Sequence, residues 1–159
     1  MHFIFHETIN LQIKSFKKGF SQILPIESLR PFNSEEELES LICGQLNDSE
    51  WTNFDRLLEV IMPDHGFDRN SRVFRDFIKY LTEVKASDRP QLMKFLSGSR
   101  RMHAGGFAAL NPRLTVVLKK VEGVSKAGAD LHLPSVSTCA KYLKIPGYSS
   151  YEVLKTKFN

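Results

Sequence analysis

LPSVSTCAKYLKIP, residues 133–146, places one cysteine between a small polar run and a short alternating segment. Pro134 cannot donate a backbone hydrogen bond, and Pro146 ends any regular structure before it. Between the two prolines, the run YLKI at 142–145 favours a short strand. We therefore expect Cys139 to lie in a loop at the mouth of a strand, where a partner can reach its thiol. The alternative is a half-buried structural side chain, because a free cysteine packs as a small hydrophobe.

The length and composition describe an ordinary globular chain. Its 159 residues suffice for one core, or for one domain and a piece of another. No apolar run is long enough to cross a membrane, so we expect no membrane partner. The two cysteines lie far apart and form no disulfide framework. We expect both thiols to be free in a reducing compartment, and the chain to be cytoplasmic and/or nuclear.

The formal net charge of +4 is mild, and the excess of lysine and arginine over aspartate and glutamate is greatest in the last third of the chain. This bias could serve an acidic partner, but a solvated face is its commoner origin. The sequence contains no recognised nucleic-acid-binding module and no pattern of stacking aromatic residues. We therefore expect no nucleic-acid partner.

The first part of the chain is expected to be helical. Apolar residues recur at spacings of four, three and four within residues 8–24, which predicts an amphipathic helix. Ser34 and Glu37 have the spacing of a capping box and open a second helix. Gly44 suits its C-terminal cap. Cys43 falls on the apolar face of that helix, and we expect it to have a structural role.

From about residue 47 onward the pattern predicts a compact α+β unit, and the polar residues 44–48 before it are a candidate hinge. His65 follows Asp64 in a predicted turn at 63–66, where local hydrogen bonding is favoured over an acid–base pair. Ser149 is the expected cap of the last helix. Further elements are expected as helices at 49–61, 70–84 and 87–98 and as strands at 114–118 and near 142–145.

The surroundings of Cys139 in the sequence limit its possible chemistry. All five histidines precede Cys139, which reverses the papain order, and Pro134 separates the nearest one, His132, from the thiol. Two distant cysteines make a poor metal site. Transfer from an activated acyl group remains as a possible reaction. The exchange of a thiolate with a thioester has a reaction free energy near zero and needs no dedicated catalytic triad. Lys141 and Lys144 would favour the thiolate if they faced it.

Several motifs, in order, resemble one known family. Leu133-Pro134, the spacing to Cys139 and the run from 143 to 150 resemble the active-site segment of HECT-type E3 ubiquitin ligases. Residues 94–107, KFLSGSRRMHAGGF, resemble the family's helix-to-loop motif. Three segments resemble its ubiquitin-fusion-degradation subgroup: residues 63–67, 111–112 and 114–117. Segments between residues 16 and 44 resemble the end of the family's N-lobe.

The resemblance implies a division into lobes. Residues 1–44 would be the C-terminal helices of the N-lobe, 45–48 the inter-lobe hinge, and 49–159 the C-lobe. The implied fold is α+β, with a small C-lobe-like sheet packed with helices after a short helical N-lobe remnant. The chain would be a C-terminal fragment or truncated product of such a ligase, lacking most of the N-lobe and the C-terminal tail.

The resemblance also implies a function. Cys139 would accept ubiquitin from an E2 conjugating enzyme as a thioester and pass it to a lysine of a protein substrate. Thr138, the residue before the nucleophile, would support the active site. No cofactor and no metal are implied. The alternative within the same fold is a non-catalytic module that binds ubiquitin or regulates a full ligase.

The chain also departs from the family pattern. Ser97 replaces the usual threonine, and Arg100 and His103 stand where the subgroup usually has prolines. The histidine that many relatives place two residues before the cysteine is Ser137 here. The resemblance therefore extends over nearly the whole chain but does not include every active-site residue of the family.

Overall fold

The computed structural model describes residues 9–44, 49–102, 105–120 and 126–159. The chain divides into two compact units, Met1–Ile42 and Cys43–Asn159. The hinge expected at 45–48 lies outside the described residues. Because the two units are not placed relative to each other, each is described by itself.

The smaller unit is helical. It contains α2 (Asn10–Phe20), η1 (Ile26–Leu29) and most of α3 (Glu35–Cys43). α2 ends four residues before the expected limit of residue 24, and a turn follows it. None of its residues is buried, and Ile13 and Phe16 on its apolar stripe are exposed. The described part of this unit therefore contributes no buried core residue of its own.

The capping box at the start of α3 is confirmed. The Ser34 hydroxyl accepts the backbone N–H of Glu37 at 3.1 Å. The Glu37 carboxylate in turn accepts the backbone N–H of Asn33 at 2.9 Å. These bonds satisfy amide groups that a helix start leaves without intrahelical partners, so the local sequence alone fixes where α3 begins.

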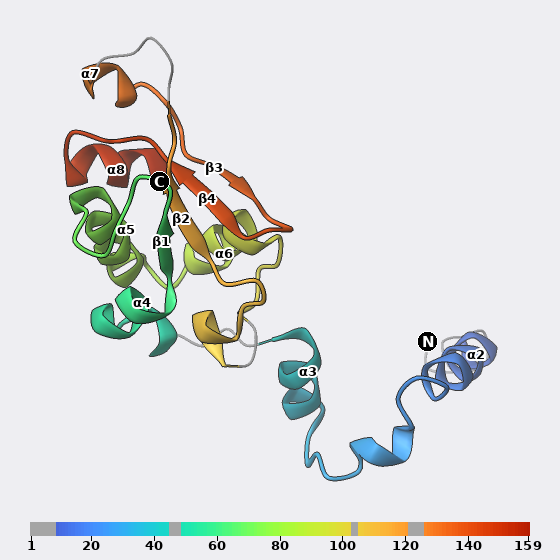
Figure 1. Ribbon diagram of the computed structural model, residues 1–159. Coiled ribbons are helices and arrows are strands. Elements are labelled where there is room, and N and C mark those ends of the chain that lie inside the picture. Colours follow the sequence, from blue (N-terminus) through green and yellow to red (C-terminus); the bar gives the residue numbers. More distant parts are fainter. Residues whose placement is uncertain (1–8, 45–48, 103–104, 121–125) are drawn as a thin grey trace. The chain divides into compact units, whose positions relative to one another are not determined.

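The larger unit is a mixed α+β fold, which confirms the expected fold class (Figure 1). Helices and short strands are interspersed along the chain. In order they are η2 (Ser49–Trp51), α4 (Phe54–Val60), β1 (Met62–Asp64), α5 (Arg72–Glu83), α6 (Arg89–Ser97), η3 (Gly106–Ala109), β2 (Thr115–Leu118), α7 (Lys126–Ala129), β3 (Ser135–Ser137), β4 (Tyr142–Ile145) and α8 (Tyr151–Phe158). The single helix expected at 49–61 is interrupted, because Asn53 caps a new helix by accepting the N–H of Arg56.

Four strands form one sheet in the order β1-β2-β4-β3. β2 pairs in parallel with both β1 and β4, whereas β3 pairs antiparallel with β4. The expectation of a turn from residue 63 was wrong, since Met62–Asp64 is a strand and the turn follows it. Pro63 is compatible with this strand because β1 lies at the edge of the sheet, where a missing N–H costs little.

The core lies between the sheet and the helices. α5 turns Phe74, Phe77, Ile78 and Leu81 inward at helical spacing, and each is 0% exposed. They belong to one cluster with strand residues such as Leu143. Every buried hydrophobic side chain among the described residues lies between Trp51 and Leu154. The larger unit therefore contains the described core.

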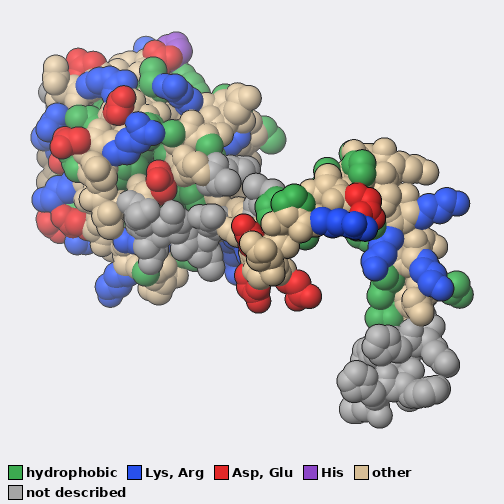
Figure 2. All heavy atoms as spheres, turned by 90° about the horizontal axis from the view of Figure 1, so that it is seen from below, with side chains coloured by type: hydrophobic (Ala, Val, Ile, Leu, Met, Phe, Trp, Pro, Cys, Tyr) green, Lys and Arg blue, Asp and Glu red, His purple; other side chains and the backbone are tan. Residues whose placement is uncertain are grey.

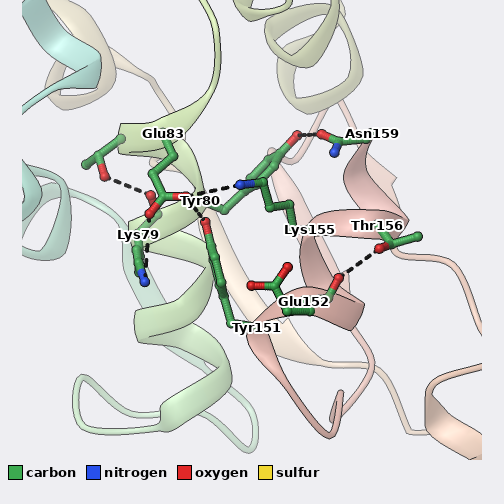
Figure 3. A network of polar contacts seen from close by, with 9 residues as sticks. Lys79, Tyr80, Glu83, Tyr151, Glu152, Lys155, Thr156 and Asn159 are labelled. Atoms are coloured by element: carbon green, nitrogen blue, oxygen red, sulfur yellow. Dashed lines mark hydrogen bonds and ion pairs between the residues drawn. The ribbon is translucent and has the colours of Figure 1, made fainter.

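A polar network joins α5 to α8 (Figure 3). The Tyr151 hydroxyl donates to the Glu83 carboxylate at 2.5 Å, and the ammonium groups of Lys155 and Lys79 lie 3.4 and 3.7 Å from it. The hydrogen bond from Tyr151, followed by the bond and charge of Lys155, lowers the pKa of Glu83. α8 is thus held against α5 by charge as well as by packing.

The start of α8 differs by one residue from expectation. Ser150, not Ser149, is the N-cap, and its hydroxyl accepts the N–H of Val153 at 3.3 Å. Ser149 instead binds the carboxylate of Asp130 through its hydroxyl at 2.5 Å and its N–H at 2.8 Å. Both serines have the chemistry of a cap, and a contact distant in the sequence decides between them.

Candidate active site

Cys139 lies in a turn at the end of a β-hairpin. β3 and β4 pair antiparallel, with Ser137 opposite Tyr142, and residues 138–141 connect them. The Cys139 side chain is exposed and free of any disulfide. The expected position, a loop at the mouth of a strand, is confirmed. The strand β3 before the cysteine was not expected, because SVS has a weak strand propensity.

Lys141 anchors this turn to the rest of the unit. Its N–H donates to the Thr138 carbonyl at 3.3 Å, and its own carbonyl accepts the N–H of Thr115 at 2.9 Å. Its ammonium group donates to the carbonyl of Asn111 at 2.9 Å. The Lys141 backbone has φ +49°, a left-handed conformation that few non-glycine residues adopt. The turn beside Cys139 is therefore held in one shape.

Thr138 forms the other flank of the turn and is half-buried. It lies close to Gly98, the left-handed C-cap of α6, since a Cβ at Gly98 would stand 3.8 Å from the Thr138 Cβ. Beyond Gly98, the loop is closed by serine side chains. The Ser97 hydroxyl accepts the Ser99 N–H at 3.3 Å, and the Ser99 hydroxyl accepts the Arg101 N–H at 3.2 Å. The loop therefore presents an ordered backbone beside Thr138.

No described histidine has a hydrogen bond to Cys139 or another residue of the turn 138–141 among the contacts of the fold. His132 precedes β3, whereas Cys139 follows it. His65 lies in the turn after β1, and its N–H donates to the Asp64 carboxylate at 2.7 Å, so the expected local hydrogen bond is confirmed. The His65 ring also contacts the Tyr142 hydroxyl, which the sequence did not predict. His2, His6 and His103 lie outside the described residues.

The model of the HECT-domain (ubiquitin-transferase) family matches residues 1–159. The chain belongs to the HECT-domain family. It is 38% identical over 157 residues to the E3 ubiquitin-protein ligase TRIP12 of Danio rerio, 39% over 149 to the E3 ubiquitin-protein ligase UPL4 of Arabidopsis thaliana, and 35% over 150 to ubiquitin fusion degradation protein 4 of Saccharomyces cerevisiae.

These matches cover 99%, 94% and 94% of this HECT chain, but only 8%, 9% and 10% of the three relatives. The chain therefore spans about a tenth of the length of the curated relatives it matches. Their names confirm the expected family, including its ubiquitin-fusion-degradation type.

The second cysteine of this HECT chain differs from expectation. Cys43 is the last residue of α3 and is exposed, which does not fit the structural role expected of it. The apolar spacing of the helix exists, but Ile42 beside it is also exposed. Exposure therefore does not distinguish the two thiols. The hydrogen-bonded turn around Cys139 distinguishes them.

Two lysines stand near the cysteine turn, in a unit whose surface carries both signs of charge (Figure 2). The ammonium group of Lys141 donates to Asn111, and Lys144 points to solvent from β4. Figure 2 shows Lys and Arg side chains interspersed with Asp and Glu over the visible face of the larger unit. On this face the basic residues form no separate block, which agrees with the solvated face favoured above.

The described residues contain no group of three or more His, Cys, Asp or Glu side chains that could hold a metal ion. Over the same residues, no helix is both long and apolar enough to cross a membrane. A pocket of about 650 Å³ is lined by residues of α5, α6 and α8 and by Leu133 and Pro134. Cys139 does not line this pocket.

Proposed function

We propose that this chain is the cysteine-bearing part of a HECT-type E3 ubiquitin ligase, with Cys139 as its nucleophile. One observation carries the proposal: in a chain that matches the HECT family throughout, Cys139 is exposed in a turn whose backbone is fixed on both sides of the thiol. An accessible thiol in a fixed geometry suits attack on a large, protein-borne thioester.

The chemistry takes two transfers. The Cys139 thiolate attacks the carbonyl carbon of the thioester between ubiquitin and an E2 conjugating enzyme, and the E2 thiolate leaves. A lysine amine of a protein substrate then attacks the new thioester, forming an isopeptide bond. The Cys139 thiolate leaves in this second step and the amine proton passes to solvent. Each thioester supplies its own activation, so neither transfer needs a cofactor.

Thr138 and the lobe organisation belong to the same proposal. Thr138 supports the active site by packing the turn next to Gly98. Residues 1–44 would end the N-lobe, 45–48 form the hinge and 49–159 the C-lobe. The division into compact units between Ile42 and Cys43 supports this arrangement. A cytoplasmic or nuclear location is proposed because both cysteines are free.

The test is a non-reducing gel of the chain mixed with E1, an E2, ATP and ubiquitin. We expect a band one ubiquitin heavier that disappears on adding thiol. Cys139→Ser should lose the band or convert it into a thiol-resistant oxyester. Cys43→Ser is the matched control, because it removes the other exposed thiol, and it should keep the band.

Two results would contradict the proposal. A thiol-sensitive band that persists in Cys139→Ser or requires Cys43 would place the nucleophile elsewhere. Without any band, binding of free ubiquitin in an NMR titration would favour the non-catalytic ubiquitin-binding module instead.

A further inference from the structure

A hydrogen bond links the cysteine turn to the opposite edge of the sheet. Tyr142 is the first residue of β4, directly after the turn that contains Cys139. Its hydroxyl lies 2.7 Å from Nδ1 of His65, which follows β1. β2 stands between β1 and β4 in the sheet, so this bond passes across β2. Tyr142 thereby connects the cysteine turn to an element 77 residues earlier in the chain.

The backbone of His65 is fixed by hydrogen bonds, and its exposed ring lies beside Asp64. Nδ1 of its ring lies 3.0 Å from the Asp64 carboxylate, and its N–H donates to the same carboxylate at 2.7 Å. Its carbonyl accepts the N–H of Leu118 at 3.2 Å. Gly66 then lets the chain return over β2, with φ +98°. The backbone contacts fix the position of His65, and Nδ1 of its ring faces both the Asp64 carboxylate and the Tyr142 hydroxyl.

The backbone gives a second, independent observation. Among the described residues, only two non-glycine residues have a positive φ: His65 at +38° and Lys141 at +49°. One is the partner of Tyr142 and the other immediately precedes Tyr142. Non-glycine residues in this conformation persist where the surrounding structure imposes it, and they cluster at functional sites. The hydrogen bond between Tyr142 and His65 is therefore flanked at each end by a residue whose backbone conformation is energetically unfavourable.

Resting on the function proposed above, we propose that His65, whose backbone N–H binds Asp64, is a positioning residue that fixes the Cys139 turn through Tyr142. Lys141 anchors the turn to Asn111 and Thr115, and Tyr142 adds a second anchor across the sheet. With both anchors in place, the turn samples fewer shapes, so the thiol meets the incoming thioester carbonyl more often in a productive geometry. His65 does not touch the reacting atoms.

The chain offers variants that separate the side chain from the backbone. Tyr142→Phe removes only the hydroxyl. His65→Gly tolerates the left-handed backbone but has no polar side chain. His65→Asn tolerates the same backbone and places an amide group near the position of Nδ1, so it should restore the link. Tyr80→Phe is the matched control, since it removes a hydroxyl that donates to the Phe158 carbonyl at 3.2 Å, on α8.

The first measurement is amide hydrogen exchange of residues 138–141 in the full chain. Tyr142→Phe and His65→Gly should speed this exchange about five-fold, the effect of losing one exposed hydrogen bond, while exchange in β2 stays constant. The second is the rate of thioester formation on Cys139 against the concentration of charged E2. Here kcat should fall by about the same factor with KM unchanged. His65→Asn should recover both, and Tyr80→Phe should affect neither.

Unchanged exchange at 138–141 in Tyr142→Phe would overturn the inference, whether or not Cys139 accepts ubiquitin. Equal acceleration of amide exchange in the turn and in β2 would also overturn it, because the hydrogen bond would then stabilise the whole unit and not the turn in particular. If wild-type chain forms no thioester, the proposed function fails, and the exchange pattern with its rescue by His65→Asn still decides whether His65 positions the turn.

Discussion

Replacing Leu143 by alanine tests whether the small sheet holds the cysteine hairpin by packing. Leu143 lies within β4, is 0% exposed, and pairs in register with Val116 of β2 and Val136 of β3. Truncation of a buried leucine costs about 2–5 kcal/mol, through lost transfer free energy and through the cavity left behind. Strands flank β4 on both sides and limit collapse of that cavity, so we expect a loss of about 3–5 kcal/mol.

The assay is urea unfolding followed by the fluorescence of Trp51. Trp51 is the sole tryptophan, is 2% exposed and belongs to the same core cluster as Leu143, so its signal reports the larger unit. Lys144→Ala is the matched control, because Lys144 is the next residue of β4 and is exposed. Its effect should stay within about 0.5 kcal/mol. A loss below about 1 kcal/mol for Leu143→Ala, or equal losses for both variants, would refute the packing argument.

Three further predictions concern the same unit. The pKa of Glu83 is lowered in the folded state, so its stabilising contribution is present above its ordinary pKa of 4.5 and is lost as the pH falls through the folded value. Unfolding free energies measured from pH 7 down to pH 3 should therefore fall less steeply in Glu83→Gln, and parallel curves would contradict this. Gly66 has φ +98°, and Gly66→Ala adds a Cβ 2.9 Å from the Leu118 Cβ. The substitution should lower the free energy of unfolding by about 1–3 kcal/mol in the urea assay, and an unchanged midpoint would contradict this. Asn53→Ala removes the cap of α4 and should cost about 1 kcal/mol, with Asn53→Asp retaining stability if capping is the cause.

Local sequence signals were sufficient for several helices. The inward positions of α5 follow from their spacing, and the cap of α3 follows from Ser34 and Glu37. Pro90 in the first turn of α6 and Gly98 at its end mark the limits of that helix. In each case the deciding interactions lie within a few residues, which is the range that periodicity and capping rules describe.

The strands and the environment of the site depended on distant contacts. β1 and β3 have three residues each, include a proline or serines, and exist because longer neighbours pair with them. The exposed turn of Cys139 followed from its flanking prolines. The bond from Tyr142 to His65 did not, because no local rule relates residues 77 positions apart. The exposure of Cys43 was missed because helical periodicity shows which residues share a face, not what covers that face.

The parallel pairing of β2 with β1 and β4 has a kinetic consequence. Sheets assembled from segments far apart in sequence fold slowly, because the entropy cost of closing the long loop arises before the stabilising contacts between the strands form. The Lys141 bond closes over 30 residues, and the Tyr142 bond closes over 77. In a refolding experiment, helices with local contacts should form first and the hairpin around Cys139 should order late. A folding intermediate in which β2 has not yet paired with β4 would contain Cys139 but would lack the Lys141 and Tyr142 hydrogen bonds that orient its turn.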